Sequence, residues 1–161
     1  MSQVRAASVE DVPGILPMAR AICALHAAMD PARFDYLPDV VERYGRWLPS
    51  RANDPRSVLL VGEVDEGGRS ALAGFLVGTV EGNVPIYRTA EFGFIHDVWV
   101  EPRSRGSGLG GELVDAAVAR FRAMGVKQVR LETAAMNDGA RALFGRRGFR
   151  VSAIEMMWGE K

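Results

Sequence analysis

The chain has 161 residues, which is enough for one domain with a sizeable core and too few for two. Apolar residues make up 48% and charged residues 25%, the balance of an ordinary globular protein. The 20 basic and 20 acidic side chains cancel, so the basic excess that is typical of non-specific nucleic-acid binders is missing. We therefore expect a single domain over residues 1–161 and no nucleic-acid partner.

Cysteine and histidine are scarce. Cys23 is the only cysteine, so neither an intramolecular disulfide nor a multi-cysteine metal site can form. His26 and His96 alone cannot build a zinc site of the usual kind, and we expect no metal. No apolar run approaches the roughly 20 residues needed to cross a bilayer, and the N-terminus lacks the basic and apolar segments of a secretory signal. We expect no membrane partner and, by default, a cytoplasmic protein.

The N-terminal part predicts a short extended segment at residues 4–7 followed by two helices. Ser8 is a suitable cap for a helix over about 9–29, in which apolar residues recur at helical spacing. Asp30-Pro31 ends that helix, and a second helix is expected over 39–48.

Strands dominate the middle of the chain, and strands and helices alternate after it. The expected elements are strands at 57–64, 70–80 and 92–100, a helix at 109–124, a strand at 126–133, a short helix at 137–147, and one or two strands within 149–158. This order predicts an α/β protein with helices packed against a central sheet.

A basic, glycine-rich loop follows the strand that ends at Val100. Its glycines, with those of the following helix start, are Gly106, Gly108, Gly110 and Gly111. Glycine lets backbone N–H groups approach a ligand without a Cβ in the way. The helix start adds unpaired N–H donors and a partial positive charge, and Arg105 adds a full charge at the rim. The stretch therefore predicts a pyrophosphate site.

Two segments resemble a known family. The pattern Arg105-x-x-Gly108-x-Gly110 is similar to the acetyl-CoA signature of the GNAT superfamily of N-acetyltransferases. Downstream, Asn137-x-x-Ala140-x-x-Leu143-Phe144-x-x-x-Gly148-Phe149 resembles the asparagine-to-Gly-Phe stretch of that family, in the same order and one strand apart. The resemblance implies a mixed, mostly antiparallel central sheet of six to seven strands flanked by about four helices. It also implies that the fourth and fifth strands splay apart to admit the cofactor.

The resemblance also implies roles for individual residues, with acetyl-CoA as the co-substrate. Backbone atoms of Val98, Trp99 and Val100 would pair with the pantetheine arm. The pyrophosphate would be held by the amides of Gly106, Ser107, Gly108, Leu109, Gly110 and Gly111, with Arg105 beside them. Asn137 would lie near the pantetheine or the thioester, although asparagine is also a common helix cap.

The activity that the resemblance implies is direct transfer of an acetyl group to an amine, without an acyl-enzyme. The acceptor would be a small molecule or a peptide, and a second copy of the chain, in a homodimer, is a further candidate partner. A non-catalytic acyl-CoA-binding sensor on the same fold is the alternative. Cys23 is expected on an amphipathic helix far from the loop in sequence, which argues against a covalent cysteine.

Two positions depart from the family's pattern. Many relatives have a tyrosine at the position of Phe144 that can protonate the leaving thiolate, and phenylalanine cannot. Some polyamine-acetylating relatives have a glutamate base where this chain has His96. A strand period of two places His96 on the face of Val98 and Val100, and an imidazole titrates near neutrality. His96 is therefore the candidate general base, and a hydrogen-bonded structural histidine is the other interpretation.

The same glycines fit a rival pattern. Gly106-x-Gly108-x-x-Gly111 satisfies the dinucleotide-binding fingerprint, and Glu132 lies about 20 residues further on, where a ribose-binding acid would stand. However, five residues separate the strand from Gly106, whereas that fingerprint needs its turn at the strand end. Only 50 residues follow Gly111, too few for the rest of that fold.

Several carboxylates remain open as acceptor or proton-transfer groups. Asp97 is expected on the face opposite His96 and is interpreted first as structural. Asp30 and Asp35 lie among aromatic residues of the segment 25–36, where they suit either a turn or the binding of a cationic amine. Glu91, at the start of its strand, is a further candidate.

Overall fold

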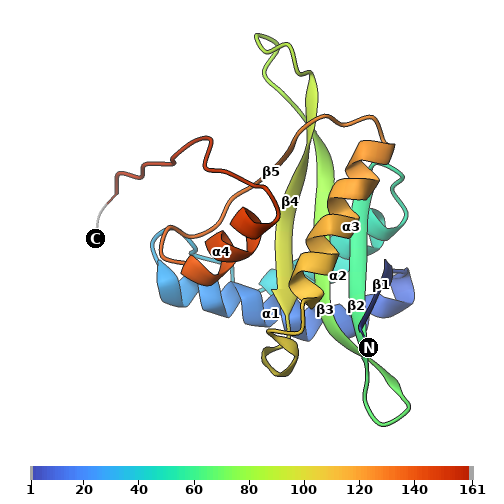
Figure 1. Ribbon diagram of the computed structural model, residues 1–161. Helices are drawn as coiled ribbons and strands as arrows, with labels where there is room; N and C mark the ends of the chain where they lie inside the picture. The colour runs from blue at the N-terminus through green and yellow to red at the C-terminus, as the bar shows by residue number, and fades with distance from the viewer. Residues whose placement is uncertain (1, 160–161) are drawn as a thin grey trace.

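The computed structural model describes residues 2–159 and places one mixed sheet between two layers of helices (Figure 1). The strands are β1 (Ser2–Ala6), β2 (Ser57–Asp65), β3 (Ser70–Gly82), β4 (Glu91–Val100) and β5 (Val129–Leu131). The helices are α1 (Val12–Met29), α2 (Val40–Ala52), α3 (Leu109–Ala123) and α4 (Asp138–Arg146), with single 3₁₀ turns at Val9–Asp11 and Pro102–Ser104. The predicted α/β class is confirmed.

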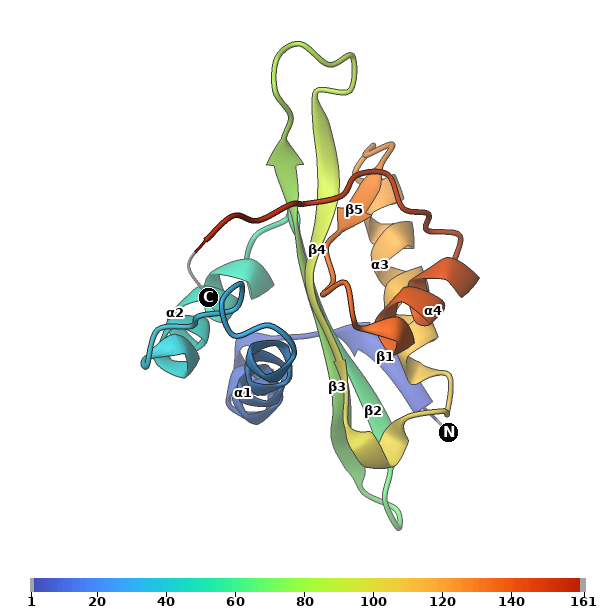
Figure 2. The same ribbon diagram turned by 90° about the vertical axis from the view of Figure 1, so that its left-hand side faces the viewer.

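The sheet has the strand order β1-β2-β3-β4-β5. The first three pairings are antiparallel, and only β4 and β5 run parallel. Figure 2 shows α1 and α2 on one face of the sheet and α3 and α4 on the other. Each layer has its own core: Ile15 and Phe75 are buried on the α1 side, and Leu113 and Phe121 on the α3 side.

Two glycines let α3 approach the sheet closely. A Cβ added at Gly93 would lie 2.7 Å from Phe121 Cγ, and one at Gly78 would lie 2.9 Å from its Cζ. The aromatic ring therefore occupies the space that side chains would fill, and it packs directly on β3 and β4. This contact fixes α3 against β4, and it thereby positions the loop that leads into α3.

The sheet has five strands among the described residues, so the expected six to seven strands are wrong. The expected strands within 149–158 do not form, and residues 150–159 have no regular secondary structure. This segment leaves α4 and crosses to the α2 side of the molecule (Figure 2). Arg33 Nε, on the α1–α2 loop, donates to Glu155 Oε1 at 2.5 Å. The segment is thus tied to a loop through a charged side chain, and its apolar residues, such as Ile154 and Trp158, stay exposed.

The first long helix also needs a correction. By length and composition, Val9–Met29 is apolar enough to cross a bilayer, contrary to the expectation that no such run exists. The core helix of a globular protein passes the same test, and here Ile15, Met18 and Ile22 are buried against the sheet.

A bulge interrupts β4 at His96. Val77 of β3 pairs with Asp97, and the next residue, Gly78, pairs with Ile95, so His96 has no partner on β3. A bulge inserts one residue into the strand and shifts the alternation of side chains that follows it.

The bulge overturns the expectation that His96 shares a face with Val98 and Val100. The His96 ring lies 5.4 Å from the Trp47 ring of α2, whereas both valines pack in the core on the α3 side. Asp97, expected on the opposite face from His96, also faces α2. A strict period of two fails here because the extra residue lies inside the strand.

Candidate active site

A cavity of about 490 Å³ opens beside β4 where the sheet splits. β5 pairs with β4 from Gly93 to Ile95 and ends at Leu131, so the second half of β4 has no strand partner on this edge. The walls come from α1, the second half of β4, the loop into α3, the residues after β5, and α4. Segments from both helical layers therefore meet at one opening in the sheet.

The glycine-rich loop forms one wall of this cavity. Gly106 and Gly108 have φ values of 79° and 95°, in the left-handed region that glycine adopts without strain. A Cβ at Gly106 would meet nothing within 4 Å, so the backbone there is open to a ligand. α3 begins directly after Gly108, and its first N–H groups have no partner within the helix. The loop therefore has the shape and the polarity of an anion site.

The Ser107 side chain does not line the cavity. Its hydroxyl donates to the backbone oxygen of Ser104 at 2.7 Å, and the residue borders a separate hollow near β1. The hydroxyl therefore stabilises the turn, which leaves the backbone amide as the part of Ser107 that a ligand can use.

Arg105 lies across the end of β4. Its Nε donates to the backbone oxygen of Val100 at 3.0 Å, and its guanidinium carbon lies 4.8 Å from the centre of the Trp99 ring. Both neighbours line the cavity. Within residues 2–159, Trp99 Nε1 is the buried side-chain donor that has no hydrogen-bond partner, and a bound ligand or water can satisfy it.

Five residues of the cavity wall were not among the predicted site residues. Ile22, Leu25 and His26 reach it from α1, and Arg146 and Arg147 reach it from the end of α4. The two arginines could have been predicted from the sequence, because they directly precede the Gly-Phe pair of the family pattern and basic side chains near an anion site commonly bind the anion. The α1 residues gave no such signal, since their spacing is that of any core helix.

One of these arginines is fitted to the start of α3. A Cβ at Gly111 would lie 1.9 Å from Arg147 Nη2, so the guanidinium packs directly on Gly111 and a larger residue there would displace it. Arg147 also pairs with Asp115 of α3 at 3.3 Å. The positive charge is therefore held beside the helix start that borders the loop.

Asn137 and Phe144 come from α4 and the residue before it. Asn137 Oδ1 accepts a hydrogen bond from the Ala140 amide at 3.1 Å, so the side chain caps the helix while the residue also lines the cavity. Phe144 is buried, with its ring 5.8 Å from that of Phe149. It packs as expected and carries no group that could donate a proton.

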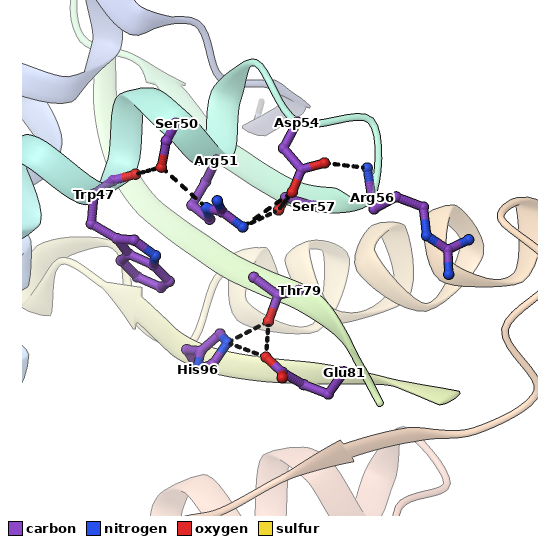
Figure 3. Close-up of polar contacts among 9 residues, drawn as sticks. All are labelled: Trp47, Ser50, Arg51, Asp54, Arg56, Ser57, Thr79, Glu81 and His96. Atoms are coloured by element: carbon purple, nitrogen blue, oxygen red, sulfur yellow. Dashed lines mark hydrogen bonds and ion pairs between the residues drawn. The ribbon is translucent and has the colours of Figure 1, made fainter. Parts of the chain in front are cut away.

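His96 is on the cavity wall despite its reversed face. Its Nε2 lies 2.6 Å from Thr79 Oγ1 and 3.6 Å from Glu81 Oε1 (Figure 3). Burial lowers the pKa of His96 below its ordinary value, and the charge of Glu81 opposes this effect. The neutral imidazole is therefore the form present at neutral pH.

Asp97 is buried on the α2 side rather than in the cavity wall. The Tyr44 hydroxyl donates to its Oδ2 at 2.8 Å. Burial raises the pKa of Asp97 to about 6, while the hydrogen bond from Tyr44 acts in the opposite direction.

Two of the remaining acidic candidates, Glu91 and Asp30, bind other parts of the protein. Glu91 pairs with Arg56 and does not border the cavity. Asp30 accepts a hydrogen bond from the backbone N–H of Arg33 at 3.1 Å, which is the turn interpretation. Glu132 does line the cavity.

Neither a thiol nucleophile nor a metal cluster lies at this opening. Cys23 is buried and is not part of the cavity wall, and burial raises the pKa of its thiol. In the part of the chain that the structure describes, no group of three His, Cys, Asp or Glu side chains could hold a metal ion.

Residues 22–149 match the family model described as the acetyltransferase (GNAT) family. The chain belongs to this family. The matched range includes the loop, the split between β4 and β5, and α4. Members of the family use acetyl-CoA, and the open loop amides, the unsatisfied Trp99 Nε1 and the arginines around the cavity fit such a cofactor.

Curated relatives agree with the family. A mycothiol acetyltransferase of Corynebacterium aurimucosum is 32% identical over 122 residues, which cover 73% of this chain and 38% of that protein. The N-alpha-acetyltransferase MAK3 of Arabidopsis thaliana is 37% identical over 76 residues, covering 47% of this chain and 40% of that protein. The chain thus spans about two fifths of the length of these relatives.

Solved structures share the fold. A mutant of the BH1408 protein from Bacillus halodurans has a TM-score of 0.82 at 21% identity, covering 99% of both chains. A predicted acetyltransferase with acetyl-CoA from Clostridium acetobutylicum has a TM-score of 0.75 at 16% identity, covering 99% of this chain and 96% of that one. At these identities the likeness shows the fold.

Proposed function

We propose that the chain is an acetyl-CoA-dependent N-acetyltransferase that transfers the acetyl group directly to an amine. The observation that carries this proposal is the position of His96 on the wall of the same cavity that the glycine-rich loop lines. A base and an anion site therefore open on one space, which is the arrangement that acyl transfer to an amine requires.

The loop and β4 would hold acetyl-CoA, which supplies a reactive thioester carbonyl when bound. The amides from Gly106 to Gly111 would bind the pyrophosphate, with Arg105 and Arg147 adding positive charge. The edge of β4 at 98–100 is free of β5 and would pair with the pantetheine arm. Asn137 would offer its side-chain amide nitrogen, because its oxygen already caps α4.

His96 would accept the proton that the attacking amine loses. Its lowered pKa keeps the imidazole neutral at physiological pH, which is the form that can take a proton. Asp97 and Glu91 suit this role less well, since neither borders the cavity.

Direct transfer follows from the nucleophiles that are within reach. Cys23 is buried on the core-facing side of α1, and its raised pKa keeps it a thiol. An acyl-cysteine intermediate would need a thiolate at the cavity wall.

The acceptor would be the amine of a small molecule or a peptide. The names of the relatives support this class, because one is a mycothiol acetyltransferase and another an N-alpha-acetyltransferase. The acceptor would enter on the side of α1, where Leu25 and His26 form the cavity wall.

A screen of amines with acetyl-CoA, read as release of CoA thiol, tests the proposal. The panel should include small amines, amino sugars and peptides with free N-termini. We expect turnover with at least one class, and we expect His96→Ala and His96→Gln to lower kcat/KM by at least about tenfold. Tight acetyl-CoA binding without thiol release for any amine would instead indicate the sensor alternative.

A further inference from the structure

Two side chains of β3 form a hydrogen-bonded chain with His96. Thr79 Oγ1 lies 2.6 Å from His96 Nε2 and 2.5 Å from Glu81 Oε1 (Figure 3). Thr79 is buried, with 6% of its surface exposed. The direct separation of Glu81 Oε1 from Nε2 is 3.6 Å, so the hydroxyl lies between the carboxylate and the imidazole.

The backbone explains why these three groups meet. Thr79 and Glu81 are two residues apart on β3, so their side chains share one face of the strand. His96 lies two residues after Phe94, which pairs with Thr79, so the imidazole shares that face and packs edge-on against Trp47 at 5.4 Å. The bulge that follows places Asp97 on the same face and turns Val98 and Val100 toward the α3 layer.

The number of protons available fixes the direction of each hydrogen bond. An ionised carboxylate only accepts, so the single hydroxyl proton of Thr79 is donated to Glu81. The Thr79 oxygen is then left with lone pairs toward His96, so Nε2 must carry the proton in that contact. A neutral imidazole has one N–H group, which leaves Nδ1 unprotonated.

From this arrangement we propose that Thr79 and Glu81 are positioning residues that hold His96 in the Nε2–H tautomer, so that Nδ1 takes the amine proton. This inference rests on the proposed acetyltransferase function. The amine would lose one proton to Nδ1 as its nitrogen forms the new C–N bond. The electron pair of the broken C–S bond would leave on sulfur, and His96 would return the proton to solvent. Glu81 would stabilise the transient imidazolium through the Thr79 hydroxyl.

The other charged groups around His96 do not provide an equivalent partner. Arg51 of α2 opposes protonation of the imidazole, but its guanidinium is bound to Asp54 at 3.1 Å. Asp97, next along β4, is hydrogen-bonded by Tyr44. Of the groups that line the cavity from other elements, His26 and Glu132 belong to α1 and to the segment after β5.

Nitrogen-15 NMR of the imidazoles tests the tautomer directly and needs no turnover. The chain has two histidines, so the signals that disappear in His96→Ala belong to His96 and those that remain belong to His26. Above the pKa of His96, we expect the wild-type protein to show the Nε2–H form almost alone. Thr79→Val, which has the same shape without a hydroxyl, should give a mixture of tautomers. An Nδ1–H form in the wild-type protein would overturn the inference whether or not acetyl transfer is observed.

Kinetics with the best amine from the screen test the consequence for catalysis. Thr79→Val and Glu81→Gln should each lower kcat by about tenfold or more, with little change in the KM for acetyl-CoA. Thr79→Ser keeps the hydroxyl and should restore most of the rate. Loss of Glu81 should also move the acidic limb of the pH profile to lower pH, because its charge favours the imidazolium.

A matched control separates this effect from a general loss of negative charge. Glu42 is exposed on α2 and makes no side-chain ion pair among residues 2–159, so Glu42→Gln should keep the wild-type profile. Wild-type kcat and pH profile in both Thr79→Val and Glu81→Gln would refute the positioning role. If Thr79→Val does not fold, Glu81→Gln alone decides by the same two measurements. A wild-type protein inactive with every amine would instead count against the proposed function, while the NMR result would still decide the tautomer.

Discussion

Replacing Asp97 by asparagine tests how strongly burial governs this carboxyl group. Asp97 is 9% exposed, and burial raises its pKa from 3.8 to about 6. Between those two values the folded protein holds a proton that the unfolded chain has released. Because the folded state binds the extra proton, the contribution of Asp97 to stability falls as the pH rises through this window.

The size of the effect follows from the two pKa values. Their difference is about 2, and each pH unit of difference is worth about 1.4 kcal/mol, so ionisation of Asp97 should cost about 3 kcal/mol. Asn has nearly the same shape and can still accept the hydrogen bond from Tyr44, but it cannot ionise. The free energy of unfolding of Asp97→Asn should therefore equal that of the wild type near pH 4 and exceed it by about 3 kcal/mol at pH 7 and above.

Urea unfolding of both proteins at several pH values between about 4 and 8 measures this difference. The difference between the two proteins matters rather than either curve, because Asp11, whose pKa is lowered to about 2 by Arg5, makes the whole protein less stable at low pH. Asp35→Asn, an exposed change on the α1–α2 loop, is the control. If the difference in free energy of unfolding between Asp97→Asn and the wild type stays constant with pH, burial does not keep Asp97 protonated.

Three further predictions concern the proposed site. Gly108→Asp should abolish acetyl-CoA binding in calorimetry. The control is Gly125→Asp, which has a similar φ of 83° but lies far from the loop; it should lower stability by a similar amount, about 1 kcal/mol, and still bind acetyl-CoA. Equal affinity of both variants for acetyl-CoA would show that the loop is not part of the site. Arg105→Ala should weaken acetyl-CoA more than a pantetheine analogue without the pyrophosphate, and Arg103→Ala, whose guanidinium pairs with Glu66, should affect neither. Cys23→Ala should leave the steady-state rate unchanged, and detection of an acetylated Cys23 by mass spectrometry would contradict direct transfer.

Local signals explain what the sequence could predict. The loop from Arg105 to Gly111 can be predicted from the sequence, because positive φ values and a helix start depend on a few adjacent residues. The helices are readable for the same reason, and α1 to α4 lie within a few residues of their expected bounds.

Register explains most of what the sequence could not predict. The bulge at His96 depends on how β4 pairs with β3, and no residue in β4 indicates that the strand contains a bulge. The roles proposed for Thr79 and Glu81 were missed for this reason, since their distance from His96 follows from pairing across two strands. Strands were expected within 149–158, but a strand needs a neighbour, and Glu155 is bound to the α1–α2 loop instead.

The proposed chemistry needs the opening in the sheet where β5 ends. The loop lies on the α3 side of the sheet, whereas His96 faces the α2 side, so an unbroken sheet would separate the base from the anion site. β5 stops pairing after Ile95, so the opening begins at His96, the next residue along β4. An amine that enters beside α1 can therefore reach a ligand held on the opposite side through the open edge of β4. The same geometry leaves Nε2 turned back toward β3, where Thr79 and Glu81 can hold it.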